Sequence, residues 1–491
     1  MKISINSQRL ISAALLPVVY MLASCSKLVS ISDPLDRVTN GTVFSTDDFA
    51  NGAVNGIYNT MLTENSFGKG MTALYGALSA DEVNLYQSYY NQYNPVNTNH
   101  LVLIGSGANR TCITDNLWIS AYGAIYTANA VLEGLSNSTS AGLHETARQQ
   151  FTAEAKFLRA FCYFYLVNFF GDVPLALTTE YSATATLPRS SVTDVYQQII
   201  KDLKDARDNL AATYPGGGNN RTRVNKWAAA ALLARVYLFT GDYSNALTEA
   251  TNVINQSALY VLEPDLDKVF PIASREAIWQ LNQKTMSQSS DATPEGITFL
   301  PGFTPNRDTI LVNYLLSPQL VSSFETGDKR KQQWIDVKPV YHASISAYYN
   351  RKYKTGLYNQ ILGGTPIEYS VVLRLAELYL IRAEAQAHGV GGGAAAAIAD
   401  LNTIRNRAGL SDLPGSLSGA ALLDAVAHEW QTEFFCEWGH RWFNLKRTGK
   451  AHSVLSQIPI KQPWAGDQQL LYPVPPGDIS RNKNLIQNPG Y

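Results

Sequence analysis

The sequence has no excess of charge of either sign, and this absence excludes the classes of protein that depend on one. Its 39 Lys and Arg residues are balanced by 40 Asp and Glu residues, which leaves a net charge of −1 over 491 residues. Such a chain lacks the broad cationic field that attracts nucleic acid. With 45% hydrophobic and 16% charged residues, the composition is that of a folded globular protein rather than a disordered one.

Cysteine is also scarce. Once Cys25 is set aside, the remaining three, Cys112, Cys162 and Cys436, lie far apart in the sequence. This spacing provides neither a disulfide framework nor the close C-x-x-C pairs of a zinc site. Because Cys162 and Cys436 stand among aromatic residues in helix-like segments, we expect buried thiols.

Familiar catalytic motifs are missing as well. The segment HEWQTE (428–433) begins like a zinc-protease motif, but that motif needs a second histidine four residues after the first, and Thr432 stands there. The glycines of 389–394 follow a helical pattern, so they are not a dinucleotide-binding loop. We therefore predict no catalytic residue, no metal site and no cofactor. Glycosidases can use two distant carboxylates that leave no spacing signal, so an exported hydrolase stays open as an alternative.

A row of carboxylates needs a different explanation. Glu429, Glu433 and Glu437 recur every four residues, which predicts that they share one helix face. Arg405 and Arg407 are candidate partners. We interpret the set as a partly buried structural ion network rather than an acid/base pair.

Beyond the first residues, no apolar run reaches the roughly 20 residues that a membrane-spanning helix needs. At the start, Lys2 and Arg9 lead into an apolar run over 10–23, the pattern of a secretory signal peptide, which we assign to residues 1–24. The letters LASC resemble a bacterial lipobox, which predicts lipidation of Cys25. Several acyl chains there would anchor the protein stably to a membrane. A plain secreted protein with an incidental cysteine is the alternative.

What the sequence does contain is helical periodicity over most of its length. Within 230–254, Ala234 and Ala246 are small enough for two antiparallel helices to approach, and Tyr237 is suited to the groove between them. This matches the consensus of a tetratricopeptide (TPR) helix pair. Further helices are predicted over 116–135, 146–175, 191–210, 379–410 and 422–449.

The pattern changes between about 257 and 370. The segment 276–283 alternates like a short strand, so we expect Trp279 in the core. The residues after it predict loops laid over a helical scaffold, and structured loops often carry function. Trp334, Tyr348 and Tyr349 lie in this region and are candidate ligand contacts. The Pro- and Gly-rich tail is predicted to wrap the surface.

Several segments together resemble the SusD/RagB family of Bacteroidetes outer-membrane lipoproteins. The ending YPVPPGDISRNKNLIQNPGY is similar to the family's usual ending, with Asp478 where the family often has glutamate. The residues just after Cys25 lack the acidic cluster often associated with surface export. The other similar segments are AEAKFLRAFCYFYLVNFFGDVPL, VNKWAAAALLARVYLFTGDYSNAL, VVLRLAELYLIRAEAQA, LNTIRNRAGL and EFFCEWGHRWFNLKRTG.

The resemblance implies a mainly α fold, in which TPR-like helix pairs form a right-handed superhelical scaffold and loops with short strands cover one face. It implies a lipid-anchored outer-membrane protein, exposed at the cell surface, that captures glycan without cleaving it and delivers it to a SusC-like TonB-dependent transporter. Peptide capture by the same architecture is the alternative. After the signal peptide, the implied regions are an N-terminal helical region, a loop-rich ligand-face region and a C-terminal region, at 25–256, 257–369 and 370–491.

The segment NLYQSYYNQYNP (84–95) holds four tyrosines at the spacing of one helix face, so a buried helical stripe is one interpretation. Their neighbours are Asn, Gln and Ser rather than Leu, Ile or Ala. Sugar rings stack on aromatic faces and their hydroxyls pair with amides, so we favour ligand contact. The residues are Tyr86, Tyr89, Tyr90 and Tyr93.

In the family, the ligand site draws on the loop region that follows the segment corresponding to 79–82. The resemblance therefore adds Asp81 and Arg110 as polar candidates. Both are ionisable side chains that could pair with ligand hydroxyls.

Overall fold

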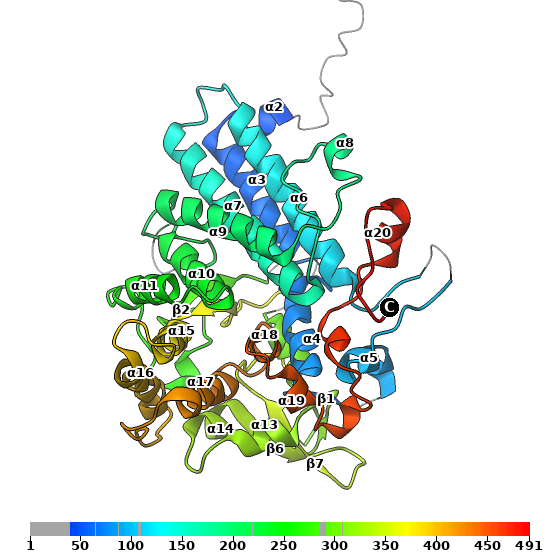
Figure 1. Ribbon diagram of the computed structural model, residues 1–491, viewed down its shortest axis with the longest axis vertical. Helices are drawn as coiled ribbons and strands as arrows, with labels where there is room; N and C mark the ends of the chain where they lie inside the picture. The colour runs from blue at the N-terminus through cyan, green and yellow to red at the C-terminus, as the bar shows by residue number, and fades with distance from the viewer. Residues whose placement is uncertain are drawn as a thin grey trace, which may run out of the picture.

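A computed structural model describes residues 40–63, 65–86, 88–106, 110–215, 217, 220–283, 291–306 and 308–491. The signal peptide and Cys25 lie outside these residues. Among the helices described, none combines the length and apolar character required to cross a bilayer. The protein is mainly helical, as predicted, with a few short strands (Figure 1).

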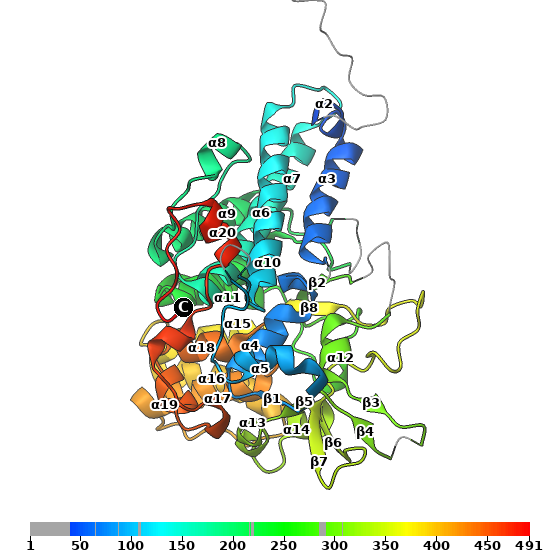
Figure 2. The same ribbon diagram turned by 90° about the vertical axis from the view of Figure 1, so that its right-hand side faces the viewer.

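Long helices form the N-terminal part of the molecule and stand side by side (Figures 1 and 2). At their centre is α7 (Glu145–Phe170), which packs against α3 (Asp47–Met61), α6 (Asp115–Asn137) and α9 (Val192–Asn209). Helix α7 is apolar around most of its circumference, and most of its residues are buried, as expected for a helix enclosed by others.

The predicted TPR-like pair is present as α10 (Lys226–Phe239) and α11 (Tyr243–Ile254). Ala234 and Ala246 are fully buried, which allows the two helices to pack closely. Gly241 connects them with a φ of 74°, a conformation that favours glycine. The second predicted pair is α15 (Leu375–Ala387) with α16 (Gly393–Arg407), and α11 packs on α15 to join the two halves of the chain.

The remaining helical segments are shorter or lie at the edges. They are α2 (Asn40–Val43), the π-helical turn η1 (Phe67–Met71), α4 (Thr72–Ser79), η2 (Ser88–Tyr93), α5 (Asn94–Asn97), α8 (Tyr181–Thr184), η4 (Leu266–Lys268), α12 (Pro294–Phe299), α13 (Pro318–Ser323), α14 (Lys329–Trp334), α17 (Gly419–Glu433), α18 (His440–Arg447), α19 (Ala451–Leu455), η5 (Pro459–Lys461), η6 (Asp467–Leu470) and α20 (Pro476–Arg481).

The strands form two-stranded antiparallel ladders instead of one sheet. The predicted strand at 276–283 is β2, and Trp279 on it is fully buried, which confirms its place in the core. The ladders pair β1 (Val83–Leu85) with β5 (Tyr314–Leu316), β2 (Ala277–Leu281) with β8 (Ser370–Arg374), β3 (Gly302–Phe303) with β4 (Ile310–Leu311), and β6 (Ile335–Pro339) with β7 (Ser346–Asn350).

The predicted ion network is buried and lies between the C-terminal helices. Arg405 donates to Glu429 at 2.8 Å, and Arg407 pairs with Glu433. The prediction of one helix face was wrong for Glu437, because α17 ends at Glu433 and the chain turns before reaching it. Three guanidinium groups close to Glu433 hold the pKa of its carboxyl well below the usual value, against the opposing effect of burial.

Glu437 bonds to partners from other elements. Arg374 on β8 donates to it at 2.9 Å, and Lys352 donates at 2.6 Å. Arg374 also reaches Glu276, which ties β8 to the start of β2. Removing one member of such a buried set leaves an uncompensated charge and typically costs about 3–5 kcal/mol.

The tail was predicted to wrap the surface, and it returns to the N-terminal helices, where Tyr472 and Asn488 are buried (Figure 1). The backbone N–H of Tyr472 donates to the carbonyl of Phe169 at 2.8 Å, and the Asn488 amide donates to the carbonyl of Phe170 at 2.8 Å. These are the last two residues of α7. Carbonyls at a helix C-terminus have no partner within the helix, so the tail supplies the partners that α7 lacks.

The three cysteines described, Cys112, Cys162 and Cys436, are buried free thiols, as predicted. Burial raises the pKa of each thiol, so these groups stay protonated and unreactive at neutral pH.

Candidate ligand-binding face

The loop-rich segment carries much of the exposed apolar surface. More than half of the large apolar side chains exposed in the described part of the chain lie between residues 297 and 367. We call this surface the loop face. Its strands, β3, β4, β6 and β7, lie at the end of the molecule opposite α2 and α8 (Figure 2). Its exposed members are Ile297, Leu311, Val337, Tyr341, Ile345, Tyr348, Leu357, Tyr358, Ile361, Leu362 and Ile367.

The β6–β7 hairpin fixes which of two neighbouring tyrosines faces outward. Side chains alternate along a strand, so Tyr348 and Tyr349 point to opposite faces. Tyr348 is 39% exposed, and its cross-strand partner Val337 is exposed with it. Tyr349 is only 3% exposed, and its hydroxyl donates to Asp336 at 3.0 Å. Tyr348 therefore remains a candidate contact, whereas Tyr349 packs inside the face and supports it.

The turn of the same hairpin presents a further tyrosine. Tyr341 is exposed, and its backbone N–H donates to the carbonyl of Ile310 at 2.8 Å, which ties the turn to β4. Its ring lies against that of His342, with centroids 3.8 Å apart. His342 has a φ of 55°, a conformation that costs energy for a residue with a side chain.

Tyr358 adds another exposed ring to the loop face. It lies against Gly302 on β3, where a Cβ would come within 2.5 Å of the ring. Neither Tyr341 nor Tyr358 was predicted from the sequence as a ligand contact. Their signal was present but weak, because both are tyrosines in the segment already predicted to be loops.

The tyrosine-rich stretch is not one α-helix, so the interpretation as a helical stripe was wrong. Strand β1 precedes it, and a 3₁₀-helix, η2, begins only at Ser88. Tyr86 lies before that helix, its N–H donates to the carbonyl of Asn313 at 2.8 Å, and its ring packs on the small apolar cluster beneath the loop face. Tyr93 packs instead on Tyr75 of the main core, at 6.0 Å between ring centroids. The side chains of Tyr89 and Tyr90 lie outside the described residues.

The polar candidates occupy different environments. Asp81 is buried and forms two hydrogen bonds of 2.7 Å with Arg441, so its carboxylate is already neutralised. Arg110 is exposed and adjoins Thr111, whose backbone pairs with Ile104. Of the two, only Arg110 presents its side chain to solvent.

Trp334 is fully buried, so it offers no surface to a ligand in this structure. It ends helix α14, and its indole N–H donates to the carbonyl of Leu266 at 3.1 Å. The ammonium group of Lys352 lies 4.8 Å from the ring centroid, within cation–π range. The expectation that Trp334 belongs to an exposed platform therefore fails, because the loop that carries it ends in a helix packed on the core.

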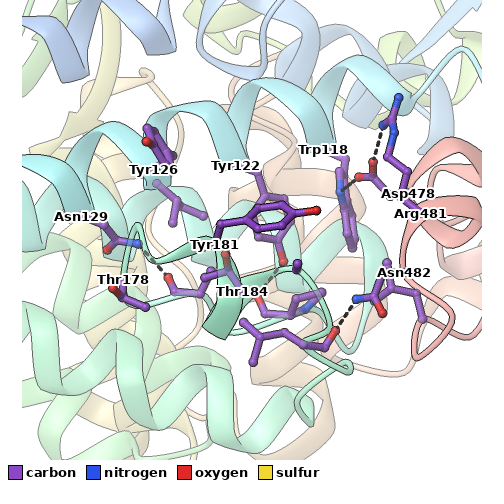
Figure 3. Close-up of a pocket in the computed structure, with 16 residues that line it drawn as sticks. Trp118, Tyr122, Tyr126, Asn129, Thr178, Tyr181, Thr184, Asp478, Arg481 and Asn482 are labelled. Atoms are coloured by element: carbon purple, nitrogen blue, oxygen red, sulfur yellow. Dashed lines mark hydrogen bonds and ion pairs between the residues drawn. The ribbon is translucent and has the colours of Figure 1, made fainter. Parts of the chain in front are cut away.

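Three pockets in the described part of the chain lie outside the loop face. One, with a volume of about 360 Å³, lies between α6, the segment around α8, and α20 (Figure 3). A wider one, of about 820 Å³, is bounded by the C-terminal helices and includes Tyr243, Glu384 and Trp430 in its wall. The loop face presents exposed rings at its surface.

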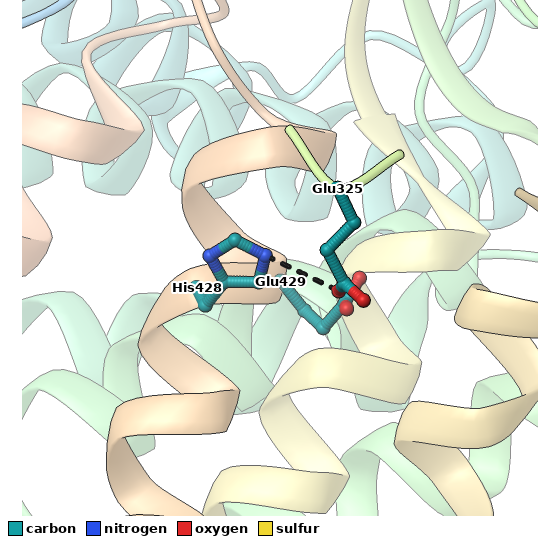
Figure 4. Close-up of side chains that lie close together, drawn as sticks. All are labelled: Glu325, His428 and Glu429. Atoms are coloured by element: carbon teal, nitrogen blue, oxygen red, sulfur yellow. Dashed lines mark ion pairs between the residues drawn. The ribbon is translucent and has the colours of Figure 1, made fainter. Parts of the chain in front are cut away.

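One group of side chains has the composition of a metal site. Glu325, His428 and Glu429 bring their ligand atoms close together (Figure 4). The guanidinium of Arg405, however, donates to Glu325 at 2.6 Å and to Glu429 at 2.8 Å. That cation already satisfies the carboxylates, so the group belongs to the ion network and the residues do not fit a metal.

Comparison with known proteins gives matches along most of the chain. Residues 45–238 match the profile of a family described as starch-binding and associating with the outer membrane, and residues 320–491 match the profile of the SusD family. SusD-like protein P2 of Formosa agariphila is 27% identical over 96% of this chain and 97% of its own length. The starch-binding protein SusD of Bacteroides thetaiotaomicron is 24% identical over 71% of this chain and 73% of its own.

Solved structures share the fold. A SusD superfamily protein from Bacteroides vulgatus superposes with a TM-score of 0.78 at 20% identity, covering 91% of this chain and all of that one. A laminarin-binding SusD-like protein superposes with a TM-score of 0.73 at 24% identity over the same shares. Surface glycan-binding protein A from Bacteroides thetaiotaomicron, solved with laminarihexaose, gives 0.72 at 20% identity, covering 90% of this chain and 99% of that one.

Residues 45–238 and 320–491 match the two family profiles, and 91% of the chain shares the fold of a SusD superfamily structure. The chain belongs to the SusD/RagB family.

Proposed function

We propose that the protein captures a glycan on the loop face without cleaving it and passes it to a SusC-like TonB-dependent transporter. In this proposal a lipid on Cys25 holds the protein at the outer membrane, on the outside of the cell. Cys25 follows a signal peptide and a lipobox-like sequence. One matching family profile is described as associating with the outer membrane, which supports this location.

The observation that carries the proposal is the presence of exposed aromatic rings on short ladders fixed to the core. Tyr341, Tyr348 and Tyr358 present flat faces suited to the CH-rich faces of sugar rings. Hairpin pairing holds the backbone of Tyr348, and the bond to Ile310 holds that of Tyr341, so these two residues have little order to gain on binding. That relatives of the same fold are described as binding laminarin or laminarihexaose supports a glycan as the ligand.

Capture without catalysis is supported by the pairing of the acids in the C-terminal ion network. In the C-terminal ion network, the carboxylates that the structure describes are paired with arginine or lysine. Among them, the guanidinium groups around Glu433 hold the pKa of its carboxyl low, so this group serves as a fixed anion rather than as a proton donor.

The proposal is tested by calorimetric titration of the purified chain with a panel of soluble polysaccharides, including laminarin, and with a matched panel of peptides. We expect heat of binding from at least one polysaccharide, and no new reducing ends after prolonged incubation. Tyr348→Ala and Tyr358→Ala should weaken that binding, whereas Phe49→Ala, an exposed aromatic on α3, should leave it unchanged.

Each of the other outcomes rejects one part of the proposed function. Binding of peptides alone replaces glycan capture with peptide capture, and release of reducing ends shows a hydrolase. Glycan binding that survives both tyrosine substitutions moves the site away from the loop face. For the partner, the full-length chain should co-purify with a transporter from detergent-solubilised outer membrane, and Cys25→Ala should abolish its membrane association.

A further inference from the structure

A row of aromatic side chains runs along helix α6, away from the loop face. Trp118, Tyr122 and Tyr126 follow one another at intervals of four residues and line the 360 Å³ pocket (Figure 3). Four residues advance a helix by about 6 Å, so the three rings cover roughly 12 Å along one side of α6. This length is comparable with that of a disaccharide.

The buried end of the row is held rigidly. The indole N–H of Trp118 donates to Asp478 at 2.8 Å, and the Tyr122 hydroxyl donates to the carbonyl of Pro174 at 2.7 Å. The Trp118 and Tyr122 ring centroids lie 4.9 Å apart, and Phe170 packs edge-on against Trp118. These contacts fix the ring orientations before any ligand arrives, which lowers the entropic cost of binding.

The open end is lined by tyrosines that the fold leaves in solvent. Tyr126 is 60% exposed, and Tyr181 on the short helix α8, which contributes the facing wall, is 80% exposed. A tyrosine ring exposed to this extent gains nothing from burial in the folded chain. Two such rings at one pocket provide apolar faces that remain available to a ligand.

Polar groups complete the wall beyond Trp118. Arg481 pairs with Asp478 at 3.2 Å, and its side chain is largely exposed, while the Asn482 amide donates to the carbonyl of Leu187 at 2.7 Å. The acid and the base balance, so this end has no net charge to attract an ion. It offers hydrogen-bond donors and acceptors with which the hydroxyl groups of a sugar can pair.

We propose that this pocket is a second saccharide site, which binds one or two residues of a neutral glycan by stacking on the exposed rings of Tyr126 and Tyr181. The inference rests on the proposed glycan binding, and it adds a site that works independently of the loop face. In Figure 2, α6, α8 and α20 lie apart from β6 and β7. A polymer held at both places would therefore dissociate more slowly than a short fragment held at one.

The chemistry of the walls favours a sugar over an apolar partner segment. The exposed rings at the mouth are tyrosines, each with a polar tip, and the far end carries Asp478, Arg481 and Asn482. An apolar helix would remove the water around the largely exposed Arg481 side chain and offer no acceptor to its guanidinium group. A sugar presents CH faces to the rings and hydroxyls to the polar end.

The test uses the full mature chain and neutral hexasaccharides: laminarihexaose, cellohexaose, maltohexaose, xylohexaose and mannohexaose. Calorimetry measures the number of binding events per chain for each sugar. We compare the wild type with Tyr126→Ala/Tyr181→Ala in the pocket and Tyr348→Ala/Tyr358→Ala on the loop face. Ile119→Ala, an exposed apolar residue of α6 outside the pocket lining, is the matched control.

We expect at least one hexasaccharide to bind at two sites. The pocket variant should lose one of them, with at least a tenfold drop in affinity, and keep the other. The loop-face variant should show the reverse pattern, and the control should keep both. Laminarin or another matching polymer should dissociate faster from the pocket variant than from the wild type.

The failure of each proposal has its own pattern. A single site that the loop-face variant abolishes and the pocket variant leaves intact overturns the second site and retains the proposed function. A single site that only the pocket variant abolishes retains the pocket but overturns binding on the loop face. No binding of any hexasaccharide or polymer to any variant overturns both.

Discussion

Arg441 on α18 donates two hydrogen bonds of 2.7 Å to the two carboxylate oxygens of Asp81, a residue 360 positions earlier in the chain. The pair joins the C-terminal helices to the loop that leads into β1. It therefore fixes the start of the tyrosine-rich stretch relative to the helical scaffold. Both side chains are largely removed from water, so each depends on the other for its hydrogen bonds.

Asp81→Asn should lower the free energy of unfolding by about 3–5 kcal/mol, because it leaves the Arg441 guanidinium buried without its counter-charge. Urea denaturation measures the change. The control is the double variant with Arg441→Met, which should cost less than the sum of the two single changes because no charge is stranded. A single-variant loss below about 1 kcal/mol, or strict additivity, would contradict this view of the pair.

Glu82 should make stability depend on pH. Burial, followed by the charge of Asp81, raises the pKa of its carboxyl to about 8, against an ordinary value of 4.5. Between these values the folded state keeps the proton that the unfolded state has released. The free energy of unfolding should therefore fall as the pH rises from 4.5 to 8, by up to about 1.4 kcal/mol per pH unit.

Glu82→Gln removes this titration, so the variant should lose less stability than the wild type across the same range. Urea denaturation at pH 5, 6, 7 and 8 gives the comparison. Burial also raises the pKa of Glu295, to about 7, but that group is common to both proteins and cancels in the difference. Parallel curves for the two proteins would show that Glu82 is already ionised in the folded state.

Two glycines should respond oppositely to alanine. A Cβ on Gly76 of α4 would come within 2.4 Å of the Cα of Gly439, so Gly76→Ala should force the backbones apart and cost about 1–3 kcal/mol. Gly52 in α3 has open space around it, so Gly52→Ala should add about 0.5–1 kcal/mol by favouring the helix. Thermal unfolding of the two variants measures whether stability falls with Gly76→Ala and rises with Gly52→Ala. Unchanged stability of Gly76→Ala would mean that α4 and α18 are not in close contact.

The neighbouring tyrosines of β7 should separate binding from stability. Tyr348→Ala should weaken glycan binding by about 1–3 kcal/mol if the ring is a central contact, and change unfolding by less than about 0.5 kcal/mol. Tyr349→Ala should cost about 3–5 kcal/mol of stability, because it empties a buried position. Tyr349→Phe keeps the ring and should lose only about 1 kcal/mol with the hydroxyl bond to Asp336. Calorimetry measures the binding and urea denaturation measures the stability. A stability loss with Tyr348→Ala, or none with Tyr349→Ala, would contradict these roles.

The helical fold was largely predictable, because helix periodicity and the TPR consensus depend on residues close together in sequence. Ala234 and Ala246 identified the α10–α11 pair, and Trp279 identified a core strand. The pairing of Glu437 with Arg374 was not predictable in the same way. It depends on where α17 ends, and the turn after Glu433 passes through Cys436 at a φ of 55°, which periodicity does not encode.

The candidate site was less predictable, because exposure depends on tertiary packing. Tyr348 and Tyr349 are identical in type and adjacent, yet the hairpin register places one in solvent and the other inside. Trp334 lies in a loop-like stretch, but a short helix carries it into the core. The row of Trp118 and Tyr122 had a readable spacing of four, but nothing in the sequence shows that α8 and α20 leave a pocket above it.

The return of the tail to α7 has a consequence for how the molecule is made. The carbonyls of Phe169 and Phe170, which close α7, accept hydrogen bonds from Tyr472 and Asn488, about 300 residues later in the chain. A nascent chain can build most of the N-terminal bundle early, yet that bundle acquires these hydrogen bonds only after the C-terminal segment has been made. A chain that stops before Tyr472 therefore lacks these hydrogen bonds at the C-terminal end of α7, far from the point where it stops.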